Sequence, residues 1–114
     1  MTLNPSTRRV NQRHDVSIPG VVKLPEGDRE VDITNLSVGG LYIKDNYSYK
    51  NRKMYKVLFS IPTLKDEIAV NIMLRWIERD DNGIKGVGGQ FIGIKAKEVW
   101  GLTQYFSSLD SEEI

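Results

Sequence analysis

The sequence contains no cysteine and only one histidine, His14. Without cysteine the chain can form no disulfide, thiolate metal site or thiol nucleophile. A single histidine leaves no pair at metal-binding spacing, so the sequence gives no sign of a transition-metal site. We expect His14 to be a solvated surface residue rather than a catalytic base. The sequence therefore favours a binding protein over an enzyme, with no metal and no cofactor.

Long apolar runs are absent as well. No stretch approaches the roughly 18 apolar residues that a membrane span requires, and no apolar segment follows a basic start as in a signal peptide. We therefore expect a cytoplasmic protein without a membrane span. The length of 114 residues suits a single domain. A formal net charge of +1 counts against a dedicated duplex-DNA binder, which more often carries a strong basic excess.

The charge is nevertheless unevenly distributed along the chain. Residues 1–14 lack an apolar period and include the stretch "RRVNQRH", which contains three arginines and no acidic residue. We interpret residues 1–14 as an N-terminal arm. Residues 15–110 carry the periodic patterns of a folded domain, and residues 111–114 form a short acidic tail.

Six β-rich segments precede one helical segment. The β-rich segments alternate or are β-branched, and turn sequences such as Asn82-Gly83 separate them. They cover residues 16–24, 29–36, 41–44, 54–61, 68–78 and 84–94. In residues 95–109, Val99, Leu102, Phe106 and Leu109 recur at helical spacing. We predict a mainly β protein, a six-stranded antiparallel β-barrel closed by a C-terminal α-helix.

The arginines of the arm carry the first functional signal. Arg9 and Arg13 are four residues apart. On an extended arm they lie on the same side, roughly 13 Å apart, and on a helix they share one face. The planar arginine fork matches phosphate and the O6/N7 edge of guanine. The alternative, a basic tail that only improves solubility, stays open on these residues alone.

The second signal is the stretch "NLSVGG". Asn35 and Ser37 are two residues apart, so on an extended segment their side chains point the same way. Both offer hydrogen-bond donors and acceptors. We expect Gly39 and Gly40 to turn the backbone at positive φ and to let a flat ligand approach closely. In the alternative interpretation, Asn35 and Ser37 only cap the turn.

Together these stretches resemble the PilZ domain, the bacterial receptor module for cyclic di-GMP. Its motifs, RxxxR and later [D/N]xSxxG, read here as "RVNQR" from Arg9 to Arg13 and as "NLSVGG" with Asn35, Ser37 and Gly40. Asn35 replaces the commoner Asp, which is a permitted variant. "LRWIE", "GGQF" and the C-terminal helix are also similar to the family, so the resemblance covers most of the chain and implies a PilZ-like split barrel.

The resemblance implies a site for cyclic di-GMP. Arg9 and Arg13 would clamp a phosphate and a guanine edge, Asn35 and Ser37 would bind the other guanine, and Gly40 would give clearance. Trp76, and Gly39 beside the turn, are second-tier ligand contacts, although packing within the barrel explains Trp76 equally well. The arm would be loose without ligand and would wrap around it once bound.

Arg8, directly before Arg9, bears on stoichiometry. A stacked pair of ligands brings four phosphate charges together, and a further cation would offset their repulsion. We therefore expect two molecules of cyclic di-GMP per chain, although Arg8 as a solvated neighbour is an equal alternative. Almost the whole chain is PilZ-like, so we expect the signal to leave through contact with a protein effector.

Two other functions compete with this interpretation. The chain would be a ligand-free PilZ-like interaction module if the arginines serve a protein partner. It would be a single-stranded nucleic-acid binder if Arg8–Arg13 act together with stacking tyrosines, for which the candidates are Tyr42, Tyr47 and Tyr49. The paired motifs favour the receptor over the module, and the near-neutral net charge counts against nucleic acid.

Overall fold

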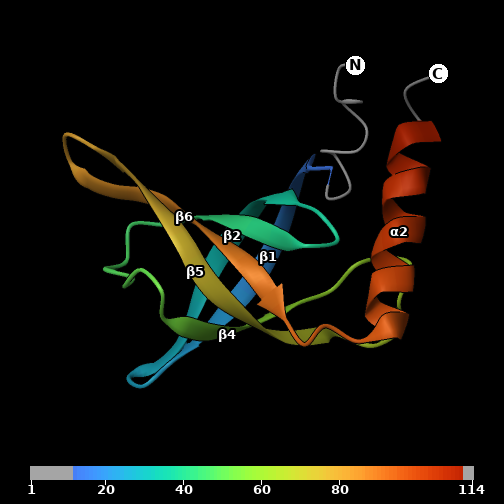
Figure 1. Ribbon diagram of the computed structural model, residues 1–114, viewed down its shortest axis with the longest axis horizontal. Coiled ribbons are helices and arrows are strands. Elements are labelled where there is room, and N and C mark those ends of the chain that lie inside the picture. Colours follow the sequence, from blue (N-terminus) through green and yellow to red (C-terminus); the bar gives the residue numbers. More distant parts are fainter. Residues whose placement is uncertain (1–11, 112–114) are drawn as a thin grey trace, which may run out of the picture.

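Six antiparallel strands close into a barrel in the computed structural model, which describes residues 12–111. The strands are β1 (His14–Leu24), β2 (Gly27–Leu36), β3 (Gly40–Lys44), β4 (Met54–Phe59), β5 (Ile68–Asp80) and β6 (Gly83–Ile92). A single helix follows, α2 (Ala96–Ser111). The order around the barrel is β1-β2-β3-β6-β5-β4, and β4 pairs back with β1 (Figure 1). The predicted fold class is confirmed.

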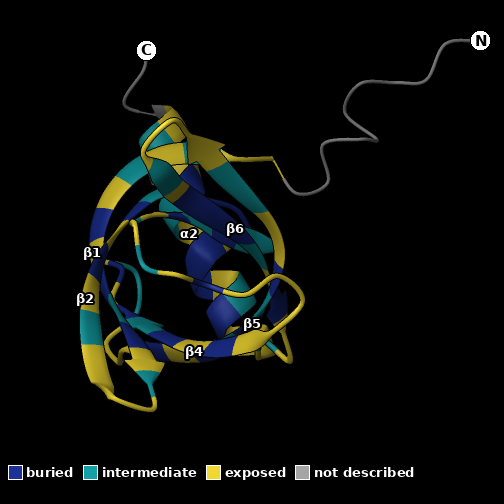
Figure 2. Ribbon diagram, turned by 90° about the vertical axis from the view of Figure 1, so that its left-hand side faces the viewer, coloured by how far each residue is buried: buried dark blue, intermediate teal, exposed yellow. Residues whose placement is uncertain are grey.

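Alternating burial along the strands fills the interior of the barrel. In β4, for example, Tyr55, Val57 and Phe59 are buried while the residues between them are exposed or half-buried. Figure 2 shows this banding along the strands, with buried segments alternating with exposed ones. The hairpins turn at Gly27 and Gly83, whose φ angles of 135° and 116° favour glycine. Alternation and turn residues together specify this part of the fold.

Helix α2 covers one end of the barrel. Leu102 is fully buried and Phe106 nearly so, and both belong to the core cluster. The glycine inside the helix has a packing reason, because a Cβ on Gly101 would lie 2.4 Å from Cγ of Leu64. The hydroxyl of Thr63 also donates a hydrogen bond to the carbonyl of Gly101. The helix therefore sits close against the segment between β4 and β5.

His14 lies between the barrel and this helix. It is the first residue of β1, and its side chain is only 12% exposed. The imidazole stacks on the ring of Phe106 with centroids 4.2 Å apart, and Nε2 lies 3.5 Å from a carboxylate oxygen of Asp110. The expectation of a solvated His14 on the arm is wrong, because pairing with Leu36 extends β1 to this residue and α2 covers it.

The opposite end of the barrel is covered by the loop of residues 45–53 (Figures 1 and 2). Arg29 on β2 donates two hydrogen bonds to the carboxylate of Asp45, at 2.8 and 2.9 Å, and the Tyr49 hydroxyl donates a third at 2.8 Å. Burial opposes the charge of Asp45, but the bonds from Arg29 and Tyr49 outweigh it and lower the pKa of this carboxyl. This ion pair fixes the loop.

The tyrosines do not form the stacking surface that single-strand binding would need. Tyr49 is only 3% exposed and packs edge-on against Tyr55. The Tyr47 hydroxyl donates to Glu26 at 2.6 Å. Tyr42 lies apart from them, beside Trp76. Tyr49 is therefore not available as a stacking residue for that alternative function, because the loop folds inward over the barrel end.

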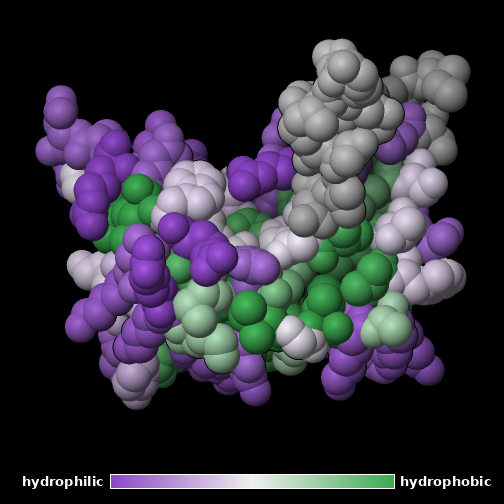
Figure 3. Space-filling model, viewed as in Figure 1, coloured by the Kyte–Doolittle hydropathy of each residue, from purple (hydrophilic) through white to green (hydrophobic). Residues whose placement is uncertain are grey.

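The outer surface is polar toward the hairpins and more apolar toward α2. In Figure 3, hydrophilic residues gather at the left and hydrophobic ones in the centre and toward the helix. The exposed large apolar side chains include Met54, Ile92 and Trp100. Within residues 12–111, no helix combines the length and apolar content needed to cross a membrane.

Replacing Leu102 by alanine should lower the free energy of unfolding by about 2–5 kcal/mol, because it leaves a cavity where α2 meets the core. Gln104→Ala, at an exposed position of the same helix, is the matched control and should change it by less than about 0.5 kcal/mol. Urea unfolding followed by circular dichroism measures both. Equal stability of the two variants would contradict the role assigned to the helix.

Candidate functional site

One row of paired residues crosses five strands on the outside of the barrel. Asp15 pairs with Asn35, and Asn35 pairs in turn with Tyr42. Tyr42 pairs with Gly88, which pairs with Trp76. Paired residues of neighbouring strands point to the same face of a sheet. The row therefore brings polar and aromatic side chains from distant parts of the sequence onto one outer surface.

A β-bulge in β5 places Trp76 on this surface. Leu74 pairs with Gly89 and Trp76 with Gly88, so Arg75 is the extra residue between them. Strict alternation would direct Trp76 inward like Leu74, which is fully buried. After the bulge Trp76 is 37% exposed instead. The ring therefore lies on the outer surface of the barrel, and its role toward a ligand stays a prediction.

Bulges in β1 and β2 act at the same level. The pairing of β1 with β2 shifts between Asp15 and Ile18, and that of β2 with β3 shifts between Ile33 and Asn35. As a result Ile33 and Leu36 both face the core, while Asn35 between them is only half-buried. Bulges re-aim side chains at barrel rims and binding sites. Here they turn Asn35 outward without removing Leu36 from the core.

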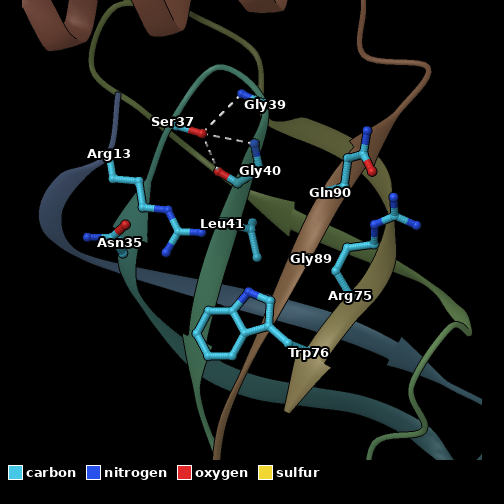
Figure 4. A pocket seen from close by; sticks show the side chains of 10 residues that line it. All are labelled: Arg13, Asn35, Ser37, Gly39, Gly40, Leu41, Arg75, Trp76, Gly89 and Gln90. Atoms are coloured by element: carbon cyan, nitrogen blue, oxygen red, sulfur yellow. Dashed lines mark hydrogen bonds between the residues drawn. The ribbon is translucent and has the colours of Figure 1, made fainter. Parts of the chain in front are cut away.

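A pocket of about 320 Å³ lies along this row, and Figure 4 shows its side chains. Six of the residues that the sequence analysis singled out line it: Arg13, Asn35, Ser37, Gly39, Gly40 and Trp76. Four further lining residues were not predicted: Leu41, Arg75, Gly89 and Gln90. Arg8 and Arg9, and all but the last three residues of the predicted arm, lie outside the described residues.

Arg13 is an exposed cation at the edge of the pocket. Its guanidinium carbon lies over the ring of Trp76, 5.9 Å from the centroid. Within residues 12–111 no carboxylate forms a salt bridge with it. A cation over an indole face gains some electrostatic stabilisation and keeps its donors available. Arg13 can therefore bind an anion or a base edge that enters the pocket.

Asn35 is held in place from β1. Its amide nitrogen donates a hydrogen bond to Oδ1 of Asp15 at 2.9 Å. This bond fixes the side chain so that its carbonyl oxygen remains an acceptor. The nearby carboxylate of Asp15 is the one negative group in the paired row, and its bond to Asn35 occupies one of its oxygens.

Ser37 closes the turn between β2 and β3. It is 6% exposed, and its hydroxyl oxygen accepts hydrogen bonds from the backbone N–H groups of Gly39 and Gly40, both at 3.1 Å (Figure 4). Its own N–H donates to the carbonyl of Gly40 at 2.9 Å. These contacts are those of a side chain that caps the turn, which is the alternative interpretation of Ser37 given above. Its role toward a ligand stays a prediction.

Gly40 is required for a different reason from the one expected. Among the described residues the glycines with positive φ are Gly27, Gly83 and Gly93, so the expectation for Gly39 and Gly40 is wrong. A Cβ on Gly40 would lie 2.2 Å from the carbonyl oxygen of Gly89 on β6. No side chain fits at that distance. Gly40 therefore permits the close approach of β3 and β6 that forms the wall of the pocket.

The aromatic part of the row rests on bare backbone. A Cβ on Gly88 would lie 2.4 Å from the Trp76 ring, and one on Gly86 would lie 2.0 Å from the Tyr42 hydroxyl oxygen. The two aromatic rings are 5.3 Å apart. Burial, together with its hydrogen bond to Glu78, raises the pKa of Tyr42 to about 12. Both rings thus lie flat on β6, with Tyr42 supporting Trp76 from the side.

Arg75 and Gln90 were missed by the sequence analysis. Arg75 directly precedes Trp76, and alternation would separate their side chains to opposite faces. Gln90 lies within the stretch "GGQF", which was interpreted only as a closing strand. The pairing of Gln90 with Gly40 brings it to the pocket. To place Gln90 at the pocket one must know which residues of β3 and β6 pair, and no local sequence pattern predicts that pairing.

Among residues 12–111, no group of three or more histidine, cysteine, aspartate or glutamate side chains is placed to hold a metal ion. The site consists instead of two arginines, two amides, a hydroxyl and an exposed indole around a glycine-lined wall. Such a set suits an anionic ligand with flat rings.

Comparison with known proteins places this geometry in context. The family model of the PilZ domain matches residues 7–107. A search of curated protein sequences finds no match.

Several solved structures share the fold. The inhibitor of motility MotI (DgrA) of Bacillus subtilis matches with a TM-score of 0.79 and 20% identity, over 92% of this chain and 52% of that one. YcgR of Escherichia coli in complex with c-di-GMP matches with a TM-score of 0.76 and 14% identity, over 93% of this chain and 47% of that one. The MrkH–c-di-GMP complex of K. pneumonia matches with a TM-score of 0.75 and 13% identity, over 93% of this chain and 54% of that one. The chain spans about half the length of these three structures, and the likeness shows the fold.

Ser37→Ala should lower the free energy of unfolding by about 1–2 kcal/mol, because it leaves the N–H groups of Gly39 and Gly40 without their acceptor. The control is Ser60→Ala, at an exposed position after β4, which should change stability by less than about 0.5 kcal/mol. Thermal or urea unfolding compares them. If the two variants were equally stable, the turn would not depend on the Ser37 hydroxyl.

Proposed function

The chain belongs to the PilZ domain family, and on that premise we propose that it is a receptor for cyclic di-GMP. The observation that carries the proposal is the pocket itself. It gathers Arg13, Asn35, Ser37 and Gly40, which match the two family motifs, beside the exposed ring of Trp76. Arg13 directly precedes β1, the stretch of residues 35–40 spans the end of β2 and the start of β3, and Trp76 lies on β5, so the site joins segments far apart in the sequence.

The chemistry of the pocket matches that of the ligand. Cyclic di-GMP carries two phosphate charges and two guanines. The guanidinium of Arg13 pairs with a phosphate or with the O6/N7 edge of a guanine. The amide of Asn35 offers hydrogen bonds to another polar edge, and Trp76 offers a face for stacking. Gly40 permits the close approach of β3 to β6 that forms the wall beside these groups.

The N-terminal arm belongs to the same proposal. Arg9, the first arginine of the motif, lies outside the described residues, and so its contact with ligand is inferred from the family motif alone. Fixing a residue of such an arm costs roughly 1–2 kcal/mol. A charge-assisted hydrogen bond contributes about 1.5–3 kcal/mol. Several contacts are needed to offset this entropic cost, so the loss of one arginine should weaken ligand binding severely.

The proposed output is a changed contact with an effector protein in the bacterial cytoplasm. Ligand bound between the arm and the barrel would create or cover a surface that the effector recognises. The proposal includes no catalytic step. The second candidate, a ligand-free interaction module, is favoured by the structural role of the Ser37 hydroxyl, which already has backbone partners.

Isothermal titration calorimetry separates these functions. The protein is titrated with cyclic di-GMP, GTP and a short single-stranded oligonucleotide under the same conditions. The receptor proposal expects saturable binding of cyclic di-GMP alone. If none of the three ligands gave a binding signal even at high ligand concentration, the interaction module would be the better description of the protein.

Arg13→Ala should weaken binding of cyclic di-GMP by at least tenfold, about 1.4 kcal/mol or more, because it removes the cation beside Trp76. Its thermal stability should stay close to that of the unmodified protein, since Arg13 is exposed. Arg79→Ala, an exposed arginine in the β5–β6 hairpin, is the control and should bind normally. Equal affinities of the two variants would remove Arg13 from the site.

Stoichiometry is a separate prediction and concerns Arg8. We expect two ligand molecules per chain. Two phosphate charges ~5 Å apart repel each other by roughly 3 kcal/mol, and the positive charge of Arg8 would offset this repulsion. Arg8→Leu should reduce the stoichiometry to one while binding persists. Calorimetry at saturating ligand with a verified active fraction gives the ratio. One ligand per unmodified chain would refute the expectation.

A further inference from the structure

Arg75 and Gln90 form the side of the pocket that faces Arg13 and Asn35. In Figure 4 Arg13 and Asn35 stand on one side of the pocket, Arg75 and Gln90 on the other, and Trp76 lies below them. The two sides come from different parts of the chain, the first from the residue before β1 and from β2, and the second from β5 and β6. Neither Arg75 nor Gln90 belongs to the two sequence motifs.

Both side chains have unused hydrogen-bonding capacity. Arg75 is exposed, and within residues 12–111 it takes part in no salt bridge. Its guanidinium presents a fork of N–H donors, and the amide of Gln90 adds both a donor and an acceptor. Lys85 on β6, by contrast, lies 3.8 Å from a carboxylate oxygen of Glu78. The pocket therefore contains a second guanidinium free to bind ligand.

The bulge gives Arg75 a defined position relative to a stacking surface. One face of the Trp76 ring lies against the backbone of Gly88. The other face, over which the exposed Arg13 guanidinium lies 5.9 Å from the ring centroid, is the one on which a base would stack once that side chain moves aside. A base stacked on that open face lies parallel to the ring and directs its edges sideways. Arg75 is the neighbour of Trp76 on β5, and Gln90 lies two residues beyond Gly88 on β6. Both flank the platform where a base edge would be.

We propose that Arg75, assisted by Gln90, recognises the O6/N7 edge of a guanine stacked on Trp76 and so contributes base specificity. The inference rests on the proposed function, because it concerns how the same pocket selects its ligand. An arginine fork binds O6 and N7 of guanine through two N–H donors, whereas adenine presents an amino group in place of O6. Arg75 is thus assigned to the base, and Arg13 remains the cation on the opposite side.

The experiment pairs a protein substitution with a change of one ligand atom. Calorimetry measures the dissociation constants of the unmodified protein and of Arg75→Ala for cyclic di-GMP and for its 7-deaza analogue, in which a C–H group replaces N7. The unmodified protein should prefer cyclic di-GMP by about fivefold or more, within the range of a bidentate contact. Arg75→Ala should bind cyclic di-GMP at least fivefold more weakly and should prefer it over the analogue by a smaller factor than the unmodified protein does, since Arg13 can still contact an O6/N7 edge. Such coupling isolates the contact between Arg75 and N7.

Arg79→Ala is the matched control, since it removes an exposed arginine from the same strand outside the pocket. It should retain both the affinity and the preference of the unmodified protein. The inference is overturned if Arg75→Ala keeps its affinity for cyclic di-GMP, or if it loses affinity but still prefers cyclic di-GMP by the original factor. Failure of the unmodified protein to bind cyclic di-GMP overturns the proposed function instead, so the two failures are distinguishable.

Discussion

The register of the barrel is the constraint on which the site depends. Bulges in β1, β2 and β5 occur at one level, where Asp15, Asn35 and Trp76 join a single outer row. The bulges in β2 and β5 direct Asn35 and Trp76 outward, while Leu36 next to Asn35 stays in the core. The barrel thus keeps a continuous interior and still presents polar and aromatic groups on its outside. Without these shifts Trp76 would point toward the core.

Close backbone approach is the second requirement, and glycine meets it. Gly40 lets β3 lie against the carbonyl of Gly89, and Gly88 lets the Trp76 ring lie flat on β6. The same residues that weaken a strand in isolation therefore shape the wall and the floor of the pocket. The turn between β2 and β3 is held by the hydroxyl of Ser37, so motif residues contribute to folding as well as to the proposed binding.

Much of the fold could be predicted because its signals are local. Alternation marked the strands, Asn82-Gly83 marked a hairpin, and the spacing of Leu102 and Phe106 marked the buried face of α2. The site was predicted in part, since Asn35 and Gly40 belong to a short motif that is visible in the sequence and is similar to a motif of the PilZ family. Arg75 and Gln90 were not found, because their place depends on which strands pair. His14 was misassigned for the same reason, since α2 covers it from the far end of the sequence.

The sequence by itself determined the periodicity of the elements, the absence of thiol chemistry and the pair of motifs that point to a dinucleotide. Only the tertiary structure decided which side chains meet. The pairing of β6 with both β3 and β5 brings Gln90 to Gly40 and Trp76 to Gly88, and a one-residue shift places Trp76 outside. Side-chain direction in a strand has a period of two, so a single extra residue reverses the face of everything that follows it. Local patterns contain no information on where such a shift occurs, because the pairing of distant strands fixes it.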